Sequence, residues 1–116
     1  MTPHNGSGAN QAIEDAYLLG RLLTQPFATL DNVHLLLAAY DSVCRPRAQA
    51  VAKVSRELGL LGEFGADIEV AEGEDEESVV AEKLLTIANW IGEGDVEDDV
   101  ARAVDILRND QLQQTA

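Results

Sequence analysis

Residues 1–23, MTPHNGSGANQAIEDAYLLGRLL, join a glycine-bearing loop directly to a helix. Residues 1–8 contain proline, asparagine, serine and two glycines before any periodic pattern begins, which predicts a loop with unusual backbone angles. Apolar residues then recur every three or four positions, which predicts an amphipathic helix running to about Thr24. These apolar positions are Ala9, Ala12, Ile13, Ala16, Leu19, Leu22 and Leu23.

The junction between this loop and this helix has the features of a ligand site. The first N–H groups of a helix have no partner within the helix and lie at the positive end of its dipole, so they suit an anionic or carbonyl-rich ligand. Gly6 and Gly8 would let the main chain come close to such a ligand. Gly-x-Gly before a helix is also common in ordinary loops that only connect elements. The residues alone leave both interpretations open, a ligand site and a structural loop.

Helical patterns also account for the middle of the chain. Asp31 is a candidate N-cap for a second helix, whose apolar pattern continues to Pro46. At Pro46 the helix either kinks or restarts as a third helix, because proline lacks a backbone donor and crowds the preceding turn. Gly59 and Gly62 are expected to close this helical region.

Two helices are predicted in the last third of the chain. One begins within residues 76–78, where acidic side chains suit the positive end of the dipole, and stops at Gly92. Asp95 is a candidate cap for the other, which is expected to run from Val96 to about Leu107 and to leave a frayed tail. No segment alternates apolar and polar residues cleanly enough to predict a strand.

Composition restricts the partners and the location. The net charge of −13, from 21 acidic against 8 basic side chains, argues against nucleic acid because no surplus of cations can release phosphate counterions. No apolar stretch reaches the roughly 20 residues of a membrane span. The single cysteine, Cys44, cannot form an internal disulfide, and no leader sequence precedes the first helix. A cytoplasmic location is therefore expected.

Three segments resemble class A FAD-dependent monooxygenases. Residues 1–23 are similar to the family's second flavin-binding motif, in which a Pro-x-x-Gly-x-Gly-x-Asn-type loop leads into a helix with Glu-Asp-Ala. Residues 35–59 resemble the segment in which a helix leads into Arg-Arg-Pro-Arg, although Cys44 replaces the first arginine. Residues 89–107 are similar to the Trp-Ile-aromatic tail of salicylate hydroxylase-like members, with Gly92 where an aromatic residue is common.

This resemblance implies a fold and a function. The chain would be mostly α, the helical C-terminal portion of an α/β, Rossmann-type FAD-binding fold, without its sheet. The parent enzyme would use FAD, NAD(P)H and O2 to hydroxylate a small aromatic substrate. The sequence contains neither the Gly-x-Gly-x-x-Gly turn nor the Gly-Asp dipeptide of the family, so we expect a fragment that supplies part of the FAD site and is inactive alone.

The resemblance also implies the site residues. Pro3 would lie beside the isoalloxazine ring, and the backbone of residues 6–10 would face the pyrimidine end of the flavin. The cofactor-binding residues would thus be Pro3, Gly6, Ser7, Gly8, Ala9 and Asn10. Main-chain donors in such a place stabilise negative charge on a reduced flavin.

The same resemblance and the charge pattern predict three segments. Residues 1–62 would hold the flavin-contacting loop and the helices that follow it. Residues 63–77 would be an acidic flexible linker, because seven carboxylates stand between Asp67 and Glu77 with no cation among them. Residues 78–116 would form a C-terminal helical pair and a frayed tail.

Other side chains that could carry chemistry are given no chemical role: His4 is interpreted as a solvated or substrate-edge residue, and the others as packing, surface or structural residues. His4 and His34 lack a recognisable partner or a second ligand, Cys44 lacks a companion, and adjacent Glu14 and Asp15 point about 100° apart on a helix. No catalytic residue and no metal ligand is therefore assigned. The alternative function is a small acidic helical interaction module, and self-association through exposed apolar helix faces is also considered.

Overall fold

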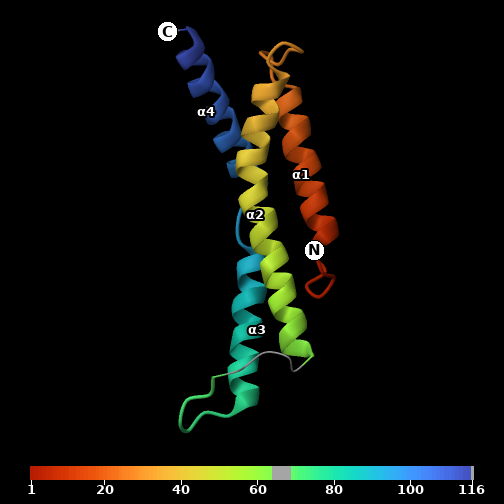
Figure 1. The fold of residues 1–116 in the computed structure, drawn as a ribbon, viewed down its shortest axis with the longest axis vertical. Coiled ribbons are helices and arrows are strands. Elements are labelled where there is room, and N and C mark those ends of the chain that lie inside the picture. The colour runs from red at the N-terminus through yellow and green to blue at the C-terminus, as the bar shows by residue number, and fades with distance from the viewer. Residues whose placement is uncertain (64–68, 116) are drawn as a thin grey trace. The chain divides into compact units, whose positions relative to one another are not determined.

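Four helices follow one another along the chain. The computed structural model describes residues 1–63 and 69–115, with side chains described as far as residue 110. The helices are α1 Gly8–Leu23, α2 Val33–Gly62, α3 Glu76–Gly92 and α4 Val96–Thr115 (Figure 1). No strand occurs in the described ranges, so the predicted mostly α-helical fold is confirmed. None of the helices found there has the length and apolar character needed to cross a bilayer.

The second helix passes through proline without interruption. α2 is one helix of 30 residues that contains Pro46, so of the two alternatives left open at this position the restart as a third helix is excluded. Proline removes one hydrogen bond to the carbonyl of Ser42, four residues earlier. Ser42 and Pro46 are both exposed, and water can therefore solvate the carbonyl that proline leaves unbonded.

The predicted cap of α2 is also corrected. The helix begins after Asn32 rather than after Asp31, because the Asn32 carbonyl accepts hydrogen bonds from the N–H groups of Leu35 at 3.0 Å and Leu36 at 3.3 Å. The Asn32 side chain shapes the preceding turn, where its Oδ1 accepts from the Thr29 N–H at 2.8 Å. Two adjacent residues with cap-forming side chains made this choice ambiguous in the sequence.

The start of α4 is as predicted, but its end is not. Asp95 Oδ1 accepts a hydrogen bond from the Glu97 N–H at 2.9 Å, which confirms the predicted cap. The helix then continues to Thr115, beyond the predicted end near Leu107. Residues 108–115 contain neither glycine nor proline, so no residue there stops a helix that has already formed.

Asp75 caps α3, which begins at Glu76 as predicted. Its carboxylate accepts hydrogen bonds from the Ser78 N–H at 2.9 Å and the Ser78 hydroxyl at 2.6 Å. These two bonds, the hydroxyl first, lower the pKa of Asp75 below its ordinary value of 3.8.

Acidification is expected to fray the first turn of α3. The folded-state pKa of Asp75 is lowered, so its stabilising effect is present above pH 3.8 and is lost as the pH falls through the folded value. Amide exchange at Ser78 and Val79 should accelerate over that range. Asp75→Ser keeps a capping oxygen but cannot titrate, so amide exchange in this variant should not accelerate in the same way at low pH. The same acceleration in the variant would contradict the assignment of the effect to Asp75.

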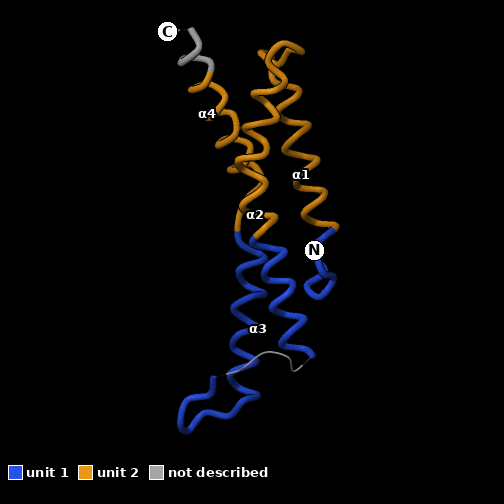
Figure 2. Tube along the Cα trace, viewed as in Figure 1, with its two compact units in different colours: residues 1–8, 50–93 blue, residues 9–49, 94–116 orange. Residues whose placement is uncertain are grey.

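The chain divides into two compact units, which Figure 2 colours separately. Unit 1 consists of Met1–Gly8 and Ala50–Glu93, and unit 2 of Ala9–Gln49 and Gly94–Ala116. Each unit thus combines segments that are far apart in the sequence.

The hydrophobic core of unit 2 is made by α1, the first half of α2, and α4. Its buried members are Leu18, Leu22, Leu36, Ala39, Val43, Val100, Ala103 and Leu107. An ion pair between Arg47 Nε and Glu14 Oε2, at 3.3 Å, joins α2 to α1, and Arg21 pairs with Glu97 of α4 at 2.8 Å. The motif helix and the Arg-Pro-Arg segment therefore meet within one unit.

The α1 face that is buried differs from the predicted one. Leu22 is buried as expected, but the predicted apolar positions Ala9, Ala12, Ile13, Ala16 and Leu23 are exposed. The helix packs through Gln11, Leu18 and Leu22 instead. Apolar residues occur on nearly every side of α1, so its periodicity could not show which side is covered.

Unit 1 has a smaller interior. Val51 and Ser55 of α2 are buried, whereas α3, which is described in full, has no buried residue. Trp90 is only half-buried. Leu84 and Leu85 are 42% and 64% exposed, so α3 leaves apolar surface uncovered in this structure.

Candidate functional site

The N-terminal loop, residues 1–7, is shaped by its own hydrogen bonds. The Gly6 N–H donates to the Pro3 carbonyl at 3.0 Å and closes a tight turn. Gly6 has a φ of 65°, in the left-handed region where a side chain is strained. The Asn5 side chain continues the turn, because its Oδ1 accepts from the Ser7 N–H at 3.1 Å. The loop is therefore closed into a tight turn by its own hydrogen bonds.

The six predicted cofactor-binding residues differ in exposure. Pro3, Gly6 and Gly8 are exposed, as are Ala9 and Asn10 in the first turn of α1. Ser7 is the exception, since it is 8% exposed and its hydroxyl donates to the Asn5 carbonyl at 3.3 Å. The Ser7 side chain therefore serves the loop, and only its backbone remains as a candidate contact.

Main-chain donors remain available at the start of α1. The N–H groups of Gly6 and Ser7 are used inside the loop. Those of Gly8, Ala9 and Asn10 have no acceptor within the described part of the chain. These three lie at the positive end of the helix, so they fit a carbonyl or anionic edge of a ligand. The assignment of the six residues to a cofactor stays a prediction.

Contacts with the second half of α2 hold the loop, and the sequence did not predict them. Ser55 Oγ lies 2.9 Å from Thr2 Oγ1 and donates to the Thr2 carbonyl at 2.5 Å. Asn5 Nδ2 donates to the Val51 carbonyl at 3.5 Å. The His4 ring rests on Gly59, which the sequence indicated only as a helix stop.

The other chemistry-bearing side chains are engaged in local structure. Glu14 pairs with Arg47, while Asp15 accepts from Gln11 Nε2 at 2.9 Å, so the two carboxylates serve different partners. His34 is exposed on α2. No group of three or more histidine, cysteine, aspartate or glutamate side chains suited to a metal ion is found among the residues that the structure describes.

Burial governs the chemistry of Cys44. Desolvation, followed by the hydrogen bond and the charge of Asp15, raises the pKa of the Cys44 thiol from 9.0 to about 12. A thiol in this state is a poor nucleophile at neutral pH.

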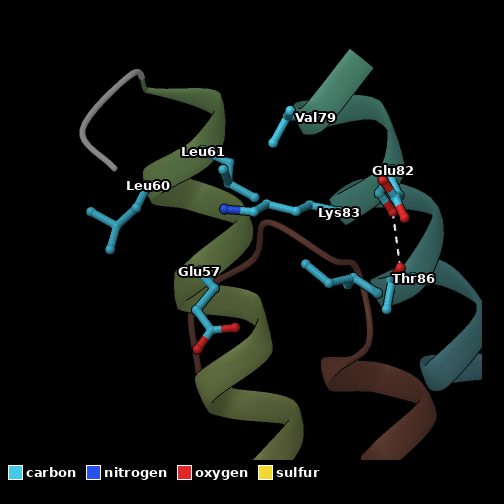
Figure 3. A pocket seen from close by; sticks show the side chains of 8 residues that line it. Glu57, Leu60, Leu61, Val79, Glu82, Lys83 and Thr86 are labelled. Atoms are coloured by element: carbon cyan, nitrogen blue, oxygen red, sulfur yellow. Dashed lines mark hydrogen bonds between the residues drawn. The ribbon is translucent and has the colours of Figure 1, made fainter. Parts of the chain in front are cut away.

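A cavity of about 540 Å³ lies between the end of α2 and α3, within unit 1 (Figure 3). Half of its lining residues are leucine, valine or isoleucine, and the Lys83 side chain extends across it from α3 toward α2. The lining residues are Glu57, Leu60, Leu61, Val79, Glu82, Lys83, Thr86 and Ile87. None of them belongs to the N-terminal loop, so the cavity is separate from the predicted cofactor contacts.

Comparison with known proteins gives matches over most of the chain. A family model described as an FAD binding domain matches residues 1–55. A salicylate hydroxylase of Pseudomonas putida is 41% identical over 103 residues, which cover 89% of this chain and 23% of that protein. An FAD-dependent monooxygenase of Gibberella moniliformis is 32% identical over 116 residues, covering 93% of this chain and 26% of that protein. The chain thus spans about a quarter of the length of these relatives.

Proposed function

Because the chain belongs to the FAD-dependent monooxygenases that include salicylate hydroxylase, we propose that residues 3–10 form one wall of the FAD site in such an enzyme. The whole protein would hydroxylate an aromatic substrate, with NAD(P)H as reductant and O2 as oxidant. The observation that carries this proposal is the set of unpartnered N–H groups of Gly8, Ala9 and Asn10 behind a preformed glycine turn. When bound, FAD supplies the electron transfer and the activation of oxygen.

The contribution of this chain would be binding and electrostatics. The three amides and the positive end of α1 would donate to the polar edge of the flavin ring and favour its negatively charged, reduced form. Gly6 and Gly8 would leave the main chain accessible, since a Cβ at Gly8 has only Met1 Sδ within 4 Å, at 3.9 Å. Pro3, exposed at the edge of the turn, would contact the ring face.

The chain by itself would bind FAD poorly. A pocket for a large cofactor buries most of the ligand surface, and a loop with one helix terminus covers only one side. We therefore expect the purified 116-residue chain to be colourless and to leave the fluorescence of added FAD unquenched. Tight one-to-one binding by the chain alone would contradict this expectation.

A longer reading frame tests the proposal directly. We expect the codons before Met1 to encode a Gly-Asp dipeptide and, farther upstream, a Gly-x-Gly-x-x-Gly turn, and the longer protein to bind FAD. In that protein Gly8→Asp, which places a carboxylate at the donors, should weaken FAD binding roughly tenfold or more, measured by fluorescence titration. Gly62→Asp, far along α2 where nothing lies within 4 Å, is the matched control.

The outcomes separate the two candidate functions. A stop codon directly upstream of Met1, or equal FAD affinity in Gly8→Asp and Gly62→Asp, would remove the support for the flavin site. The acidic interaction module would then be the better account of the exposed Leu30 and Leu85, which are 91% and 64% exposed.

A further inference from the structure

Three residues of α2 face the N-terminal loop at intervals of four. Val51, Ser55 and Gly59 lie on one side of the helix, because residues four apart are neighbours on a helix surface. All three are buried, and Ser55 is 0% exposed. We call these three residues the anchor face. The loop and the anchor face lie in the same compact unit (Figure 2).

Each residue of the anchor face meets a different residue of the loop. The buried Ser55 hydroxyl donates to the Thr2 carbonyl and accepts from the Thr2 hydroxyl, so both of its hydrogen-bonding roles are used. The Val51 carbonyl accepts from Asn5 Nδ2 at 3.5 Å.

Gly59 allows the closest of these contacts. A Cβ placed on Gly59 would lie 2.4 Å from His4 Cδ2 and 2.9 Å from His4 Cγ, well inside van der Waals contact. Glycine is a poor helix former, and Gly59 lies in the last turn of α2. The absence of a side chain here lets the His4 ring pack directly on the helix backbone.

We propose that the anchor face positions the N-terminal loop, with Ser55 and Gly59 as positioning residues that set where the Gly6 turn and the free N–H group of Gly8 are held within unit 1. The proposal rests on the proposed function only in the use it gives that N–H group. The contacts to Thr2 and His4 fix residues on the N-terminal side of the Gly6 turn, and the Asn5 contact fixes the residue whose side chain bonds the Ser7 N–H. A shift of the anchor face would therefore move the turn itself.

The test uses backbone N–H signals of the 116-residue chain, recorded by two-dimensional NMR without any cofactor. Gly59→Ala should displace the His4 ring and shift the N–H signals of residues 4–8, while helix content measured by circular dichroism stays the same or rises. Gly62→Ala is the matched control, because it makes the same change in the same helix where nothing lies within 4 Å. It should leave the loop signals in place.

A double variant separates a specific clash from a general disturbance. In His4→Ala the ring is gone, so adding Gly59→Ala to it should cause little further shift in the loop signals. Ser55→Ala should speed hydrogen exchange of the Gly6 N–H about tenfold, because the loop loses both bonds at Thr2. Unmoved loop signals in Gly59→Ala, or an equal shift with and without the His4 ring, would overturn the proposal.

These readouts are independent of flavin. If the loop signals respond as expected but the longer protein fails to bind FAD, the proposed function is wrong and the positioning role stands. If the longer protein binds FAD and Gly8→Asp weakens that binding, but Gly59→Ala leaves the loop signals unchanged, the positioning role is wrong and the proposed function stands.

Discussion

Leu22→Ala is expected to unfold most of unit 2. Leu22 is 0% exposed and belongs to the cluster that joins α1, α2 and α4. Truncation of a buried leucine removes its transfer energy and leaves a cavity, which together cost about 2–5 kcal/mol. A small single domain has a total unfolding free energy of about 5–15 kcal/mol, and a chain of this size lies near the lower end. Urea denaturation followed by far-UV circular dichroism measures the loss.

Leu30→Ala provides the matched control. The same atoms are removed, but Leu30 is 91% exposed and lies in the connection before α2. A surface substitution of this kind changes the unfolding free energy by about 0.5 kcal/mol or less. Similar midpoints for the two variants would show that α1 does not pack on α2 and α4 through Leu22.

The helices were predictable where local signals are strong. Acidic residues place the start of α3, the Asp95 cap places the start of α4, and Gly92 places the end of α3 from sequence alone, because these residues act on groups within one turn. The end of α4 was not predictable from periodicity. The apolar pattern stops near Leu107, but the helix continues because no glycine or proline follows there to end it.

The buried face of α1 shows a different limit. Ile13 is 67% exposed although it fits the apolar stripe, and Leu18, outside the stripe, is 1% exposed. Periodicity reports which sides of a helix are apolar, not which neighbour reaches them.

The loop was predictable as a turn, but its anchoring was not. The glycines and Asn5 indicate a tight turn because these residue types favour it locally. Thr2 and Ser55 are 53 positions apart in the sequence, so no local sequence pattern predicts their contact. Sequence reasoning therefore identified the turn but missed that Ser55 and Gly59 hold it.

The thiol of Cys44 is expected to react about a thousandfold more slowly with iodoacetamide at about pH 8 than an unperturbed thiol, because only the thiolate attacks. Its pKa is raised from 9.0 to about 12, mainly by burial and then by Asp15. Alkylation followed by mass spectrometry should therefore accelerate about tenfold for each pH unit in the folded chain, whereas the urea-denatured chain levels off above pH 9.

Two further measurements test the cause of this slow reaction. Asp15→Asn removes the nearby charge but keeps the burial, so it should restore only part of the reactivity. The raised folded-state pKa also means that the unfolded chain loses the thiol proton first. The stabilisation is therefore complete below pH 9 and is lost as the pH rises toward 12. A native alkylation rate within tenfold of the denatured rate at pH 8 would contradict the partly buried placement of Cys44 beside Asp15.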